Sequence, residues 1–433
     1  MAGLGGAKRV ALFFYEVHIG AAPSVIGAAS ELLRRGHEVY LFHMKPPVRM
    51  LPADLPDGVH RVEISLWSRK LTWALKRRFL RHQPAKASGP VALAEPPLTK
   101  NPLVYWIREF IVIAQIFEFA MLCRLRSPGF DFAIPFDMTG LAVMNWALPR
   151  RIPFIYWSLE ILLLAEAQRP SFRFLKRLEI RRVPEARAIV VQGRERRDLL
   201  AKDIVFRDER VVIVPNGPPT PPDVNLPRDF FYRRFNIPPS TKIVIHAGMI
   251  EPVVGSEELA GAAASWPSNF ALIFHSSEKR SPEEPYLRAV QEAGGKRVIL
   301  SLEPVPLEMV DRVYAGAHIG LIFYKPINAN YATTWESSGK LVYYLRNGLP
   351  VVIVADSPTS KLDEWGCGIW VQDFAGILDA IQTIIADYGR FSANARRCYD
   401  ENFDFRKGFD RLMAVAERST ASRPPIPTQP RTG

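Results

Sequence analysis

The chain has 433 residues, of which 48% are hydrophobic, and it carries a formal net charge of +12. This length favours two domains of about 200 residues, and the composition excludes a disordered or fibrous protein. The three cysteines, Cys123, Cys367 and Cys398, lack metal-ligand spacing, which argues against a disulfide framework or a zinc site and favours a reducing cytoplasm. The amino terminus lacks the apolar core of a secretory signal, so we expect no export.

The positive charge indicates an anionic partner, such as a nucleotide sugar, an acidic lipid surface or nucleic acid. No zinc-finger pattern or aromatic RNA-binding signature accompanies the charge, so we expect no nucleic-acid partner.

The first half of the chain predicts alternating strands and helices. A strand at 8–15, a helix at 24–35 and a strand at 37–43 form a β-α-β unit, and the near-continuous apolar strands are typical of a parallel sheet covered on both faces. The turn between the first strand and helix lacks a G-x-G-x-x-G dinucleotide fingerprint. Further strands are predicted at 131–136, 154–157, 188–191 and 211–214, and further helices at 139–148, 171–186 and 193–201. Residues 1–215 therefore predict one doubly wound α/β domain.

Two segments of this half suggest a membrane surface. If residues 66–81 are helical, apolar side chains form one stripe and basic side chains surround it, as in helices at anionic membranes; the membrane-facing residues would be Trp67, Lys76, Arg77 and Arg78. The apolar run 101–123 contains three charged residues, so it is a poor transmembrane span and is better read as a buried or interfacial helix. The alternative is a solvated basic helix packed on the domain.

A Pro-rich linker begins at Pro215, after which the alternation resumes. Strands are predicted at 242–247, 270–274, 298–301, 319–323 and 368–371, and helices at 255–265, 284–293, 306–315 and 374–388. We expect a second Rossmann-like domain over 216–395, a helical region over 396–418 that returns toward the first domain, and a disordered tail over 419–433.

Residues 336–354 predict a loop, a helix and a buried strand, with polar groups at the helix start. Ser337, Ser338 and Gly339 offer capping oxygens and close backbone approach, and Lys340 adds a positive charge in the first turn. The first N–H groups of a helix have no partner inside it, so a phosphate would bind there. Pro350 cannot continue the helix, which Gly348 can end.

This segment resembles the donor-nucleotide helix of GT-B glycosyltransferases, especially glycosyltransferase family 4, which carries a Lys-x-x-Glu-Tyr-x-x-x-Gly-x-Pro-Val-Val pattern. Further matches follow in the family's order, at 35–39, 188–194, 212–217 and 245–250. The resemblance implies a GT-B architecture, in which two doubly wound Rossmann-like domains face each other across a cleft. The second domain would bind the donor and the first the acceptor.

The chain departs from the family at three positions of the donor domain. The family's glutamate in the helix pattern falls at Tyr343, and the positions of an Arg and a Lys that contact the donor diphosphate hold Met249 or Ile250 and Val254. Lys340 and Lys325 remain as candidates for neutralising the phosphates, with solvated surface lysines as the alternative. The resemblance adds Gly248 and Asn216 to the expected donor-binding residues, beside those at the helix start.

Two carboxylates are candidates for catalysis. Asp137 follows the strand 131–136 at the carboxyl edge, where the resemblance implies a group facing the acceptor hydroxyl; alternatively it caps a helix beginning near Thr139. Glu336 lies one residue after Trp335, the position of the family's first glutamate, so a small loop adjustment would bring it to the sugar. Alternatively, it is only a carboxylate favoured at a helix start.

The remaining candidates lie in turns of the first domain. His18 would be a catalytic residue contacting the acceptor or the diphosphate, unless it is an incidental loop histidine; Gly20 and Glu160 would lie on the acceptor side. His246 follows buried-strand residues and reads as a packed core histidine. No Ser-His-Asp order or metal cluster is apparent.

The resemblance implies a retaining, metal-independent glycosyltransferase that needs no cofactor besides its nucleotide-sugar co-substrate. We expect a lipid-linked or cell-envelope glycan as acceptor, hence polysaccharide biosynthesis, and a cytoplasmic enzyme peripheral to the inner face of the cell membrane. The alternative is a catalytically inactive GT-B partner or regulatory subunit, which the missing Arg and Lys and the Tyr343 replacement favour. A nucleotide-sugar epimerase of related fold is disfavoured, because its carboxylate and histidine pattern is not evident.

Overall fold

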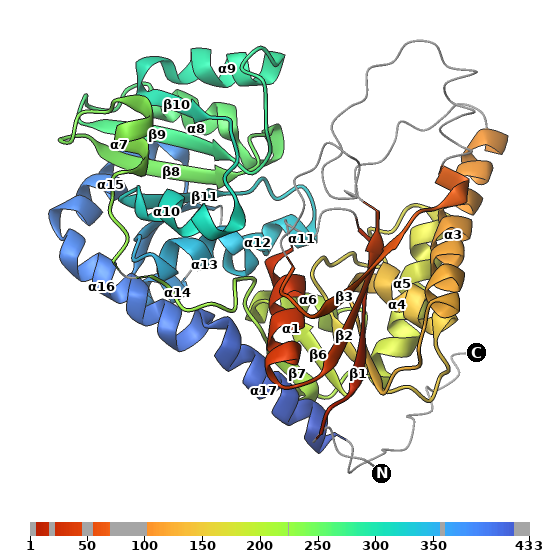
Figure 1. Ribbon diagram of the computed structural model, residues 1–433. Coiled ribbons are helices and arrows are strands. Elements are labelled where there is room, and N and C mark those ends of the chain that lie inside the picture. Colours follow the sequence, from red (N-terminus) through yellow and green to blue (C-terminus); the bar gives the residue numbers. More distant parts are fainter. Residues whose placement is uncertain are drawn as a thin grey trace.

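The computed structural model describes residues 6–16, 22–45, 55–69, 102–223, 225–355 and 360–419. The first half of the chain builds one twisted parallel sheet (Figure 1). Its strands are β1 (Arg9–Phe14), β2 (Glu38–Met44), β3 (Val59–Ile64), β4 (Phe132–Pro135), β5 (Ile155–Trp157), β6 (Ala188–Val191) and β7 (Val211–Ile213). They hydrogen-bond in the order β3-β2-β1-β4 and β5-β6-β7, and parallel bridges from Ala133 to Phe154 and from Phe136 to Trp157 join the two parts. The order 3-2-1-4-5-6 is that of doubly wound folds.

Helices cover both faces of this sheet because its strands are apolar on both faces. Along β1, Ala11 and Phe13 enter one hydrophobic core, whereas Val10, Leu12 and Phe14 enter the other. The helices of this half are α1 (Pro23–Arg34), α3 (Pro102–Leu125), α4 (Asp137–Ala147), α5 (Pro170–Arg182) and α6 (Arg194–Ala201). None of the described helices is long and apolar enough to cross a membrane.

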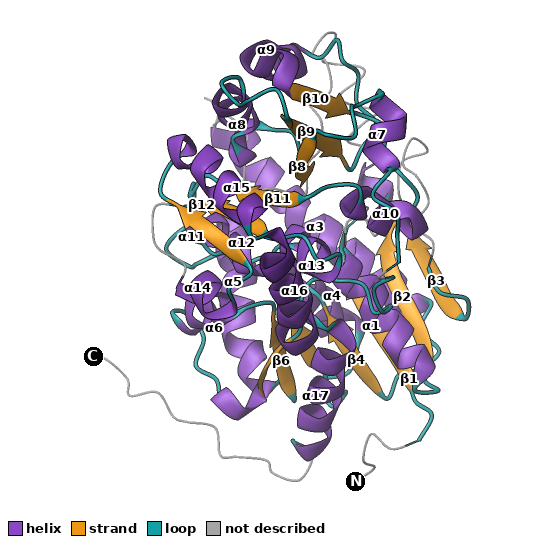
Figure 2. Ribbon diagram, turned by 90° about the vertical axis from the view of Figure 1, so that its left-hand side faces the viewer, coloured by secondary structure: helices purple, strands orange, loops and turns teal. Residues whose placement is uncertain are grey.

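The second half repeats the architecture above the first in Figure 2. Its strands are β8 (Lys242–Gly248), β9 (Phe270–Ser276), β10 (Val298–Ser301), β11 (Ile319–Phe323), β12 (Val351–Val354) and β13 (Gly368–Val371), all parallel, in the order β10-β9-β8-β11-β12-β13. Its helices are α7 (Phe230–Phe235), α8 (Ser256–Ala263), α9 (Pro285–Gly294), α10 (Val310–Ala315), α11 (Ala329–Ala332), α12 (Thr334–Ser337), α13 (Gly339–Arg346), α14 (Ser360–Trp365), α15 (Ile377–Ala386) and α16 (Tyr388–Cys398).

These two sheets confirm the predicted fold class of two doubly wound α/β units. In each sheet the strand order reverses once, between β1 and β4 and between β8 and β11. Ligands of such folds bind outside the carboxyl ends of the strands at this reversal. The reversal between β8 and β11 therefore marks where a donor site is expected.

The last helix, α17 (Phe405–Arg418), leaves the second half and packs on the first (Figure 1). Phe405 and Phe409 lie in the first half's core and stack near Trp157. Gly27 of α1 leaves room for the Phe405 ring, because a Cβ there would lie 2.5 Å from it. α17 thus packs on the first half, whereas Cys398, Tyr399 and Phe403 just before it lie in the core of the second half. The predicted domain boundaries, including a returning region over 396–418, stay predictions. The tail beyond Ser419 lies outside the described residues.

Replacing Phe405 by alanine should weaken folding, because the ring is 1% exposed and fills the space over Gly27. We expect the free energy of unfolding to fall by about 3–5 kcal/mol, measured by urea denaturation. Phe174→Ala is the control, since that ring is 48% exposed and should cost much less. Equal losses in the two variants would contradict the docking of α17.

Candidate functional site

The start of α13 holds a buried lysine at the reversal point of the second sheet. Lys340 is 8% exposed, and its Nζ lies 2.9 Å from Nε2 of His246 and 4.9 Å from the centre of the Tyr324 ring. Gly248 ends β8 with φ +104°, and a Cβ there would lie 3.2 Å from Lys340 Cε. Glycine is therefore needed at position 248 for two reasons: the backbone φ is positive, and a larger residue would crowd the Lys340 side chain. The alternative that Lys340 is a solvated surface residue is wrong.

The surroundings of Lys340 disfavour its charged form. Burial lowers the pKa of Lys340 to about 7. Burial and the nearby lysine also lower the pKa of His246 well below its ordinary value, so the imidazole is neutral and accepts the lysine's hydrogen bond. Among the described residues, no carboxylate forms a salt bridge with Lys340. A bound anion would therefore restore a charge interaction that the protein itself does not supply.

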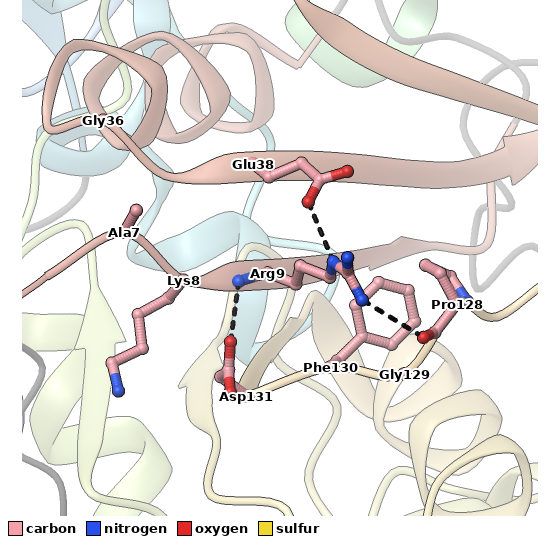
Figure 3. Close-up of a pocket in the computed structure, with 9 residues that line it drawn as sticks. All are labelled: Ala7, Lys8, Arg9, Gly36, Glu38, Pro128, Gly129, Phe130 and Asp131. Carbon is pink, nitrogen blue, oxygen red and sulfur yellow. Dashed lines mark hydrogen bonds and ion pairs between the residues drawn. The ribbon is translucent and has the colours of Figure 1, made fainter.

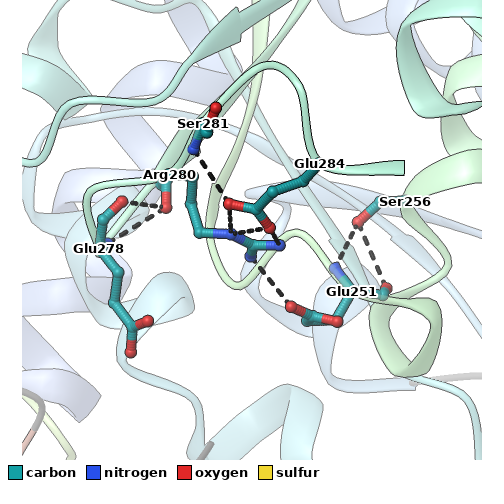
Figure 4. Close-up of polar contacts among 7 residues, drawn as sticks. Glu251, Ser256, Glu278, Arg280, Ser281 and Glu284 are labelled. Carbon is teal, nitrogen blue, oxygen red and sulfur yellow. Dashed lines mark hydrogen bonds and ion pairs between the residues drawn. The ribbon is translucent and has the colours of Figure 1, made fainter. Parts of the chain in front are cut away.

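Two other cations of this half, Lys325 and Arg280, are in contrast already neutralised by carboxylates. Lys325 pairs with Glu258. Arg280 lies between Glu284 and Glu251, with its Nη1 2.9 Å from Glu251 Oε1 (Figure 4). The Glu251 N–H donates to Ser256 Oγ at 3.1 Å, so this network ties the turn after β8 to the segment after β9. These contacts hold the turn in place and leave no unpaired charge on it.

The positions where the family would place its Arg and Lys hold apolar side chains. Of the two candidates for the Arg position, Ile250 is fully buried and Met249 is half-buried, and Val254 at the Lys position is fully buried. Tyr343, which replaces the family's glutamate, stacks on Tyr314 with ring centres 4.9 Å apart. All three departures are thus built into the packing of the second half.

The other expected donor residues divide into two groups. Ser338 is the N-cap of α13, and its Oγ accepts a hydrogen bond from Leu341 N at 3.3 Å. Gly339 lies against the linker, where a Cβ would be 3.4 Å from Asn216 O. Ser337 instead donates to carbonyl groups of its own helical turn. The structure therefore gathers Ser338, Gly339, Asn216 and Lys340 at one helix start, with Ser337 and Lys325 engaged elsewhere.

Asp137 occupies the corresponding edge of the first sheet. It is the first residue of α4, with φ +57°, and its Oδ1 accepts hydrogen bonds from Leu159 N at 2.6 Å and Glu160 N at 2.9 Å. The N-cap of α4 is Phe136, so the alternative capping role of Asp137 is wrong. Burial raises the pKa of Asp137 to about 8, assisted by the charge of Glu160 and opposed by the two N–H groups.

The loop that holds Asp137 also contacts the second half. Asn330 donates to the Glu160 carboxylate and accepts from Ile161 N at 2.9 Å, and Ala329 N donates to Glu166 Oε1 at 2.9 Å. Asn330 carries no pattern in the sequence that marks this role. Glu160, proposed on the acceptor side, is thus fixed at the junction of the two halves.

Glu336, from the second half, and Arg196, from the first half, both lie at this junction. Glu336 is 7% exposed in α12, and a Cβ on Gly193 would lie 2.8 Å from its Oε2. Arg196 of α6 donates to Leu159 O, and its Nη2 lies 3.4 Å from Thr334 Oγ1. Arg196 was missed by the sequence reasoning because it is one of three arginines in four residues, without a distinguishing pattern. The junction therefore combines two buried charged side chains, one from each half.

Several expected residues fall elsewhere. His18, Gly20, Lys76, Arg77 and Arg78 lie outside the described residues. Trp67 is described and is 81% exposed. Within the described ranges, no group of three or more His, Cys, Asp or Glu side chains is arranged to hold a metal ion.

An open pocket of about 470 Å³ lies at the amino ends of the strands of the first sheet (Figure 3). In this pocket the Nε of Arg9 donates a hydrogen bond to Glu38 Oε2 at 2.9 Å. The backbone N–H of Arg9 donates to Asp131 Oδ2, also at 2.9 Å (Figure 3). Asp137 follows the carboxyl end of β4, on the opposite edge. This pocket is therefore separate from the candidate site.

The raised pKa of Asp137 predicts a pH dependence of folding. The carboxyl binds its proton more tightly in the folded chain than at its ordinary pKa of 3.8, so it favours folding at low pH, and this contribution is lost as the pH rises toward about 8. In Asp137→Asn, the amide oxygen can still accept the two backbone hydrogen bonds, asparagine tolerates the positive φ, and the side chain no longer titrates. The stability of the wild type relative to Asp137→Asn, from urea denaturation, should fall between pH 5 and pH 8. A constant or rising difference would contradict this account.

No protein-family model and no curated protein matches the sequence. Similar solved structures include Anabaena HepE in complex with UDP and glucose, at 15% identity and TM-score 0.59, covering 96% of this chain and 100% of that one. WaaG, a glycosyltransferase involved in lipopolysaccharide biosynthesis, matches at 12% identity and TM-score 0.57, over 94% of this chain and 99% of WaaG. The UDP-forming α,α-trehalose-phosphate synthase of Burkholderia vietnamiensis matches at 10% identity and TM-score 0.58, over 96% and 99%. The chain therefore has the GT-B fold, as the sequence resemblance predicted.

Proposed function

We propose that this protein is a glycosyltransferase that moves a sugar from a nucleotide-diphosphate donor to a hydroxyl acceptor. The observation that carries the proposal is Lys340, a buried cation without a carboxylate partner among the described residues, at the start of α13 and beside the reversal point of the second sheet. HepE, of the same fold, has been solved with UDP-glucose, so UDP-glucose is the first donor to test.

The donor diphosphate would bind between Lys340 and the first N–H groups of α13. As the bond to the sugar breaks, negative charge develops on the leaving diphosphate, and a preorganised ammonium with helix N–H groups stabilises that charge. Gly248 and Gly339 would allow the phosphates to approach the backbone, because neither presents a side chain. By the family resemblance, the reaction would retain the anomeric configuration and need no metal.

The acceptor would lie on the first half, near Asp137. A carboxyl with a pKa near 8 exchanges its proton readily near neutral pH, which suits a group that handles the acceptor proton. Glu336, from the second half, would face the sugar at the junction. We keep His18 as a proposed catalytic residue that contacts the acceptor or the diphosphate, and Gly20 as a proposed acceptor-side residue, on their place in the sequence after the first strand.

A lipid-linked or cell-envelope glycan is the proposed acceptor, and the inner face of the cell membrane the proposed location. The net charge of +12 and the basic, tryptophan-bearing segment 66–81 support this proposal. WaaG, which shares the fold, is described as acting in lipopolysaccharide biosynthesis.

A catalytically inactive GT-B partner subunit is the second candidate. It is favoured by the apolar residues Met249 or Ile250 and Val254 and by Tyr343, because none of these side chains supplies the charge of the family's Arg, Lys and Glu. Binding of a nucleotide sugar without transfer or hydrolysis would select this candidate, whereas turnover would exclude it.

Lys340→Met preserves the length of the side chain and removes its charge, so it tests the donor site directly. A charge-assisted contact contributes about 1.5–3 kcal/mol, so the affinity for UDP-glucose, measured by calorimetry, should fall roughly ten- to a hundredfold. Lys325→Met is the matched control and should change the affinity little, because Glu258 already neutralises that ammonium. If Lys340→Met binds UDP-glucose as tightly as the wild type, the start of α13 is not the phosphate site.

A further inference from the structure

The helix α3 is apolar on two faces, of which the described residues cover only one. Its inner face packs into the first half's core through Ile116, Phe119, Ala120 and Cys123. On the other face, Trp106 is 59% exposed, Ile107 49%, Phe110 74% and Phe117 49%. Their spacing places all four within one stripe along the helix. A helix that is hydrophobic all round is normally buried, so this outer stripe is unusual.

The stripe continues onto α5. Trp146 of α4 contacts Phe117 of α3 with ring centres 5.8 Å apart and stacks on Phe174 of α5 at 6.4 Å. Phe174 is itself 48% exposed. Trp106, Ile107, Phe110, Phe117 and Phe174 together form what we call the α3–α5 surface. Contiguous apolar patches of this kind mark interaction sites on soluble proteins.

Unpaired positive charge borders this surface. Arg173, Arg177 and Arg181 follow one another at four-residue intervals on α5, and all three are exposed. Among the described residues none of them pairs with a carboxylate, because Glu179, on the same helix, is buried against Lys176. The other carboxylate at this contact, Glu109, is also buried and is bound by Arg169 and Ser171. The α3–α5 surface therefore combines exposed aromatic side chains with a row of free guanidinium groups.

We propose that the α3–α5 surface docks on an anionic lipid bilayer. The aromatic and aliphatic side chains would enter the boundary between headgroups and acyl chains, and the arginine row would contact lipid phosphates. Charge complementarity favours this occupant, since a bilayer offers apolar and anionic contacts over one continuous surface. α3 lies on the flank of the first sheet that faces away from the second half (Figure 1), so docking leaves the start of α13 accessible.

The inference deepens the proposed function, because it rests on a first half that presents the lipid-linked acceptor. Four of the five residues of this surface lie in the apolar run 101–123, for which the sequence indicated a buried or interfacial helix, and not in the basic segment 66–81. Only Trp67 and its immediate neighbours of the segment 66–81 are described, and none of the five residues of the α3–α5 surface belongs to it.

Co-sedimentation with vesicles tests the proposal. The wild type should sediment with vesicles of phosphatidylglycerol and phosphatidylcholine at low salt, and much less with phosphatidylcholine alone. Replacing Arg173, Arg177 and Arg181 by Gln should weaken binding to the anionic vesicles about a hundredfold, given the known contribution of each basic residue. Trp106→Ser with Phe110→Ser should also weaken binding, and salt should not mask that loss, because the lost contacts are apolar.

Two control variants separate local from general effects. Replacing Lys296, Arg312 and Arg411 by Gln removes the same charge from exposed positions elsewhere, and Val205→Ser removes a side chain that is 78% exposed. Both controls should bind vesicles nearly as the wild type does.

Failure of the wild type to sediment with anionic vesicles, or equal losses in the test and control variants, would overturn the proposal. A dimer that the Trp106 and Phe110 replacements dissociate, without vesicle binding, would instead make the surface a contact between two copies. If all variants bind UDP-glucose with unchanged affinity, the proposed donor site is not contradicted, whether the surface binds vesicles or a second copy of the chain.

Discussion

The contact between the Lys340 ammonium and the neutral His246 imidazole is the constraint on which the proposed donor site depends. An ammonium buried without a countercharge is costly, so the protein lowers the lysine's pKa and surrounds it with an imidazole and an aromatic ring. Gly248 leaves the space that the side chain needs. Because Arg280 and Lys325 are neutralised by their own carboxylates, an arriving diphosphate would find its countercharge at Lys340.

The two halves of the chain are held together close to this lysine. Asn216, in the linker, accepts a hydrogen bond from Ser24 of α1 at 2.8 Å and also lies against Gly339 at the start of α13. Asn330 and Arg196 join the halves at a second place, on the loop that holds Asp137. The chain then returns through α17 to the core of the first half. A few polar residues thus connect the proposed donor side with the proposed acceptor side.

Much of this fold was predictable because buried parallel strands read as short apolar runs. β6, β10, β11 and β13 begin and end where the sequence places them. β3 was not predicted, since it is half exposed and mixes charged with apolar residues. The predicted helix 306–315 is a short 3-10 turn followed by α10, and the four-residue helices α11 and α12 are too short to show a periodicity.

The candidate site was predictable only where its residues are neighbours in the chain. The cap of Ser338 and the position of Lys340 follow from one local pattern. The partnership of Lys340 with His246 joins residues 94 positions apart, and the sequence favoured a purely packing role for that histidine. The neutralisation of Arg280 by Glu251 and the hold of the 159–160 backbone on Asp137 also depend on tertiary pairing. The sequence could therefore indicate which lysines and arginines were candidates for phosphate binding, but it could not show which of them are already paired with a carboxylate.

The most direct test of the central claim is the proton balance of donor binding. If the diphosphate binds at Lys340, it will favour the charged lysine, whose pKa without donor is about 7. Calorimetry of UDP-glucose binding in buffers of different ionisation enthalpy should therefore show proton uptake approaching one proton at pH 8 and much less at pH 6, and Lys340→Met should abolish the uptake at pH 8. Tight binding at pH 8 without proton uptake would contradict the assignment of Lys340 as the residue that receives the diphosphate.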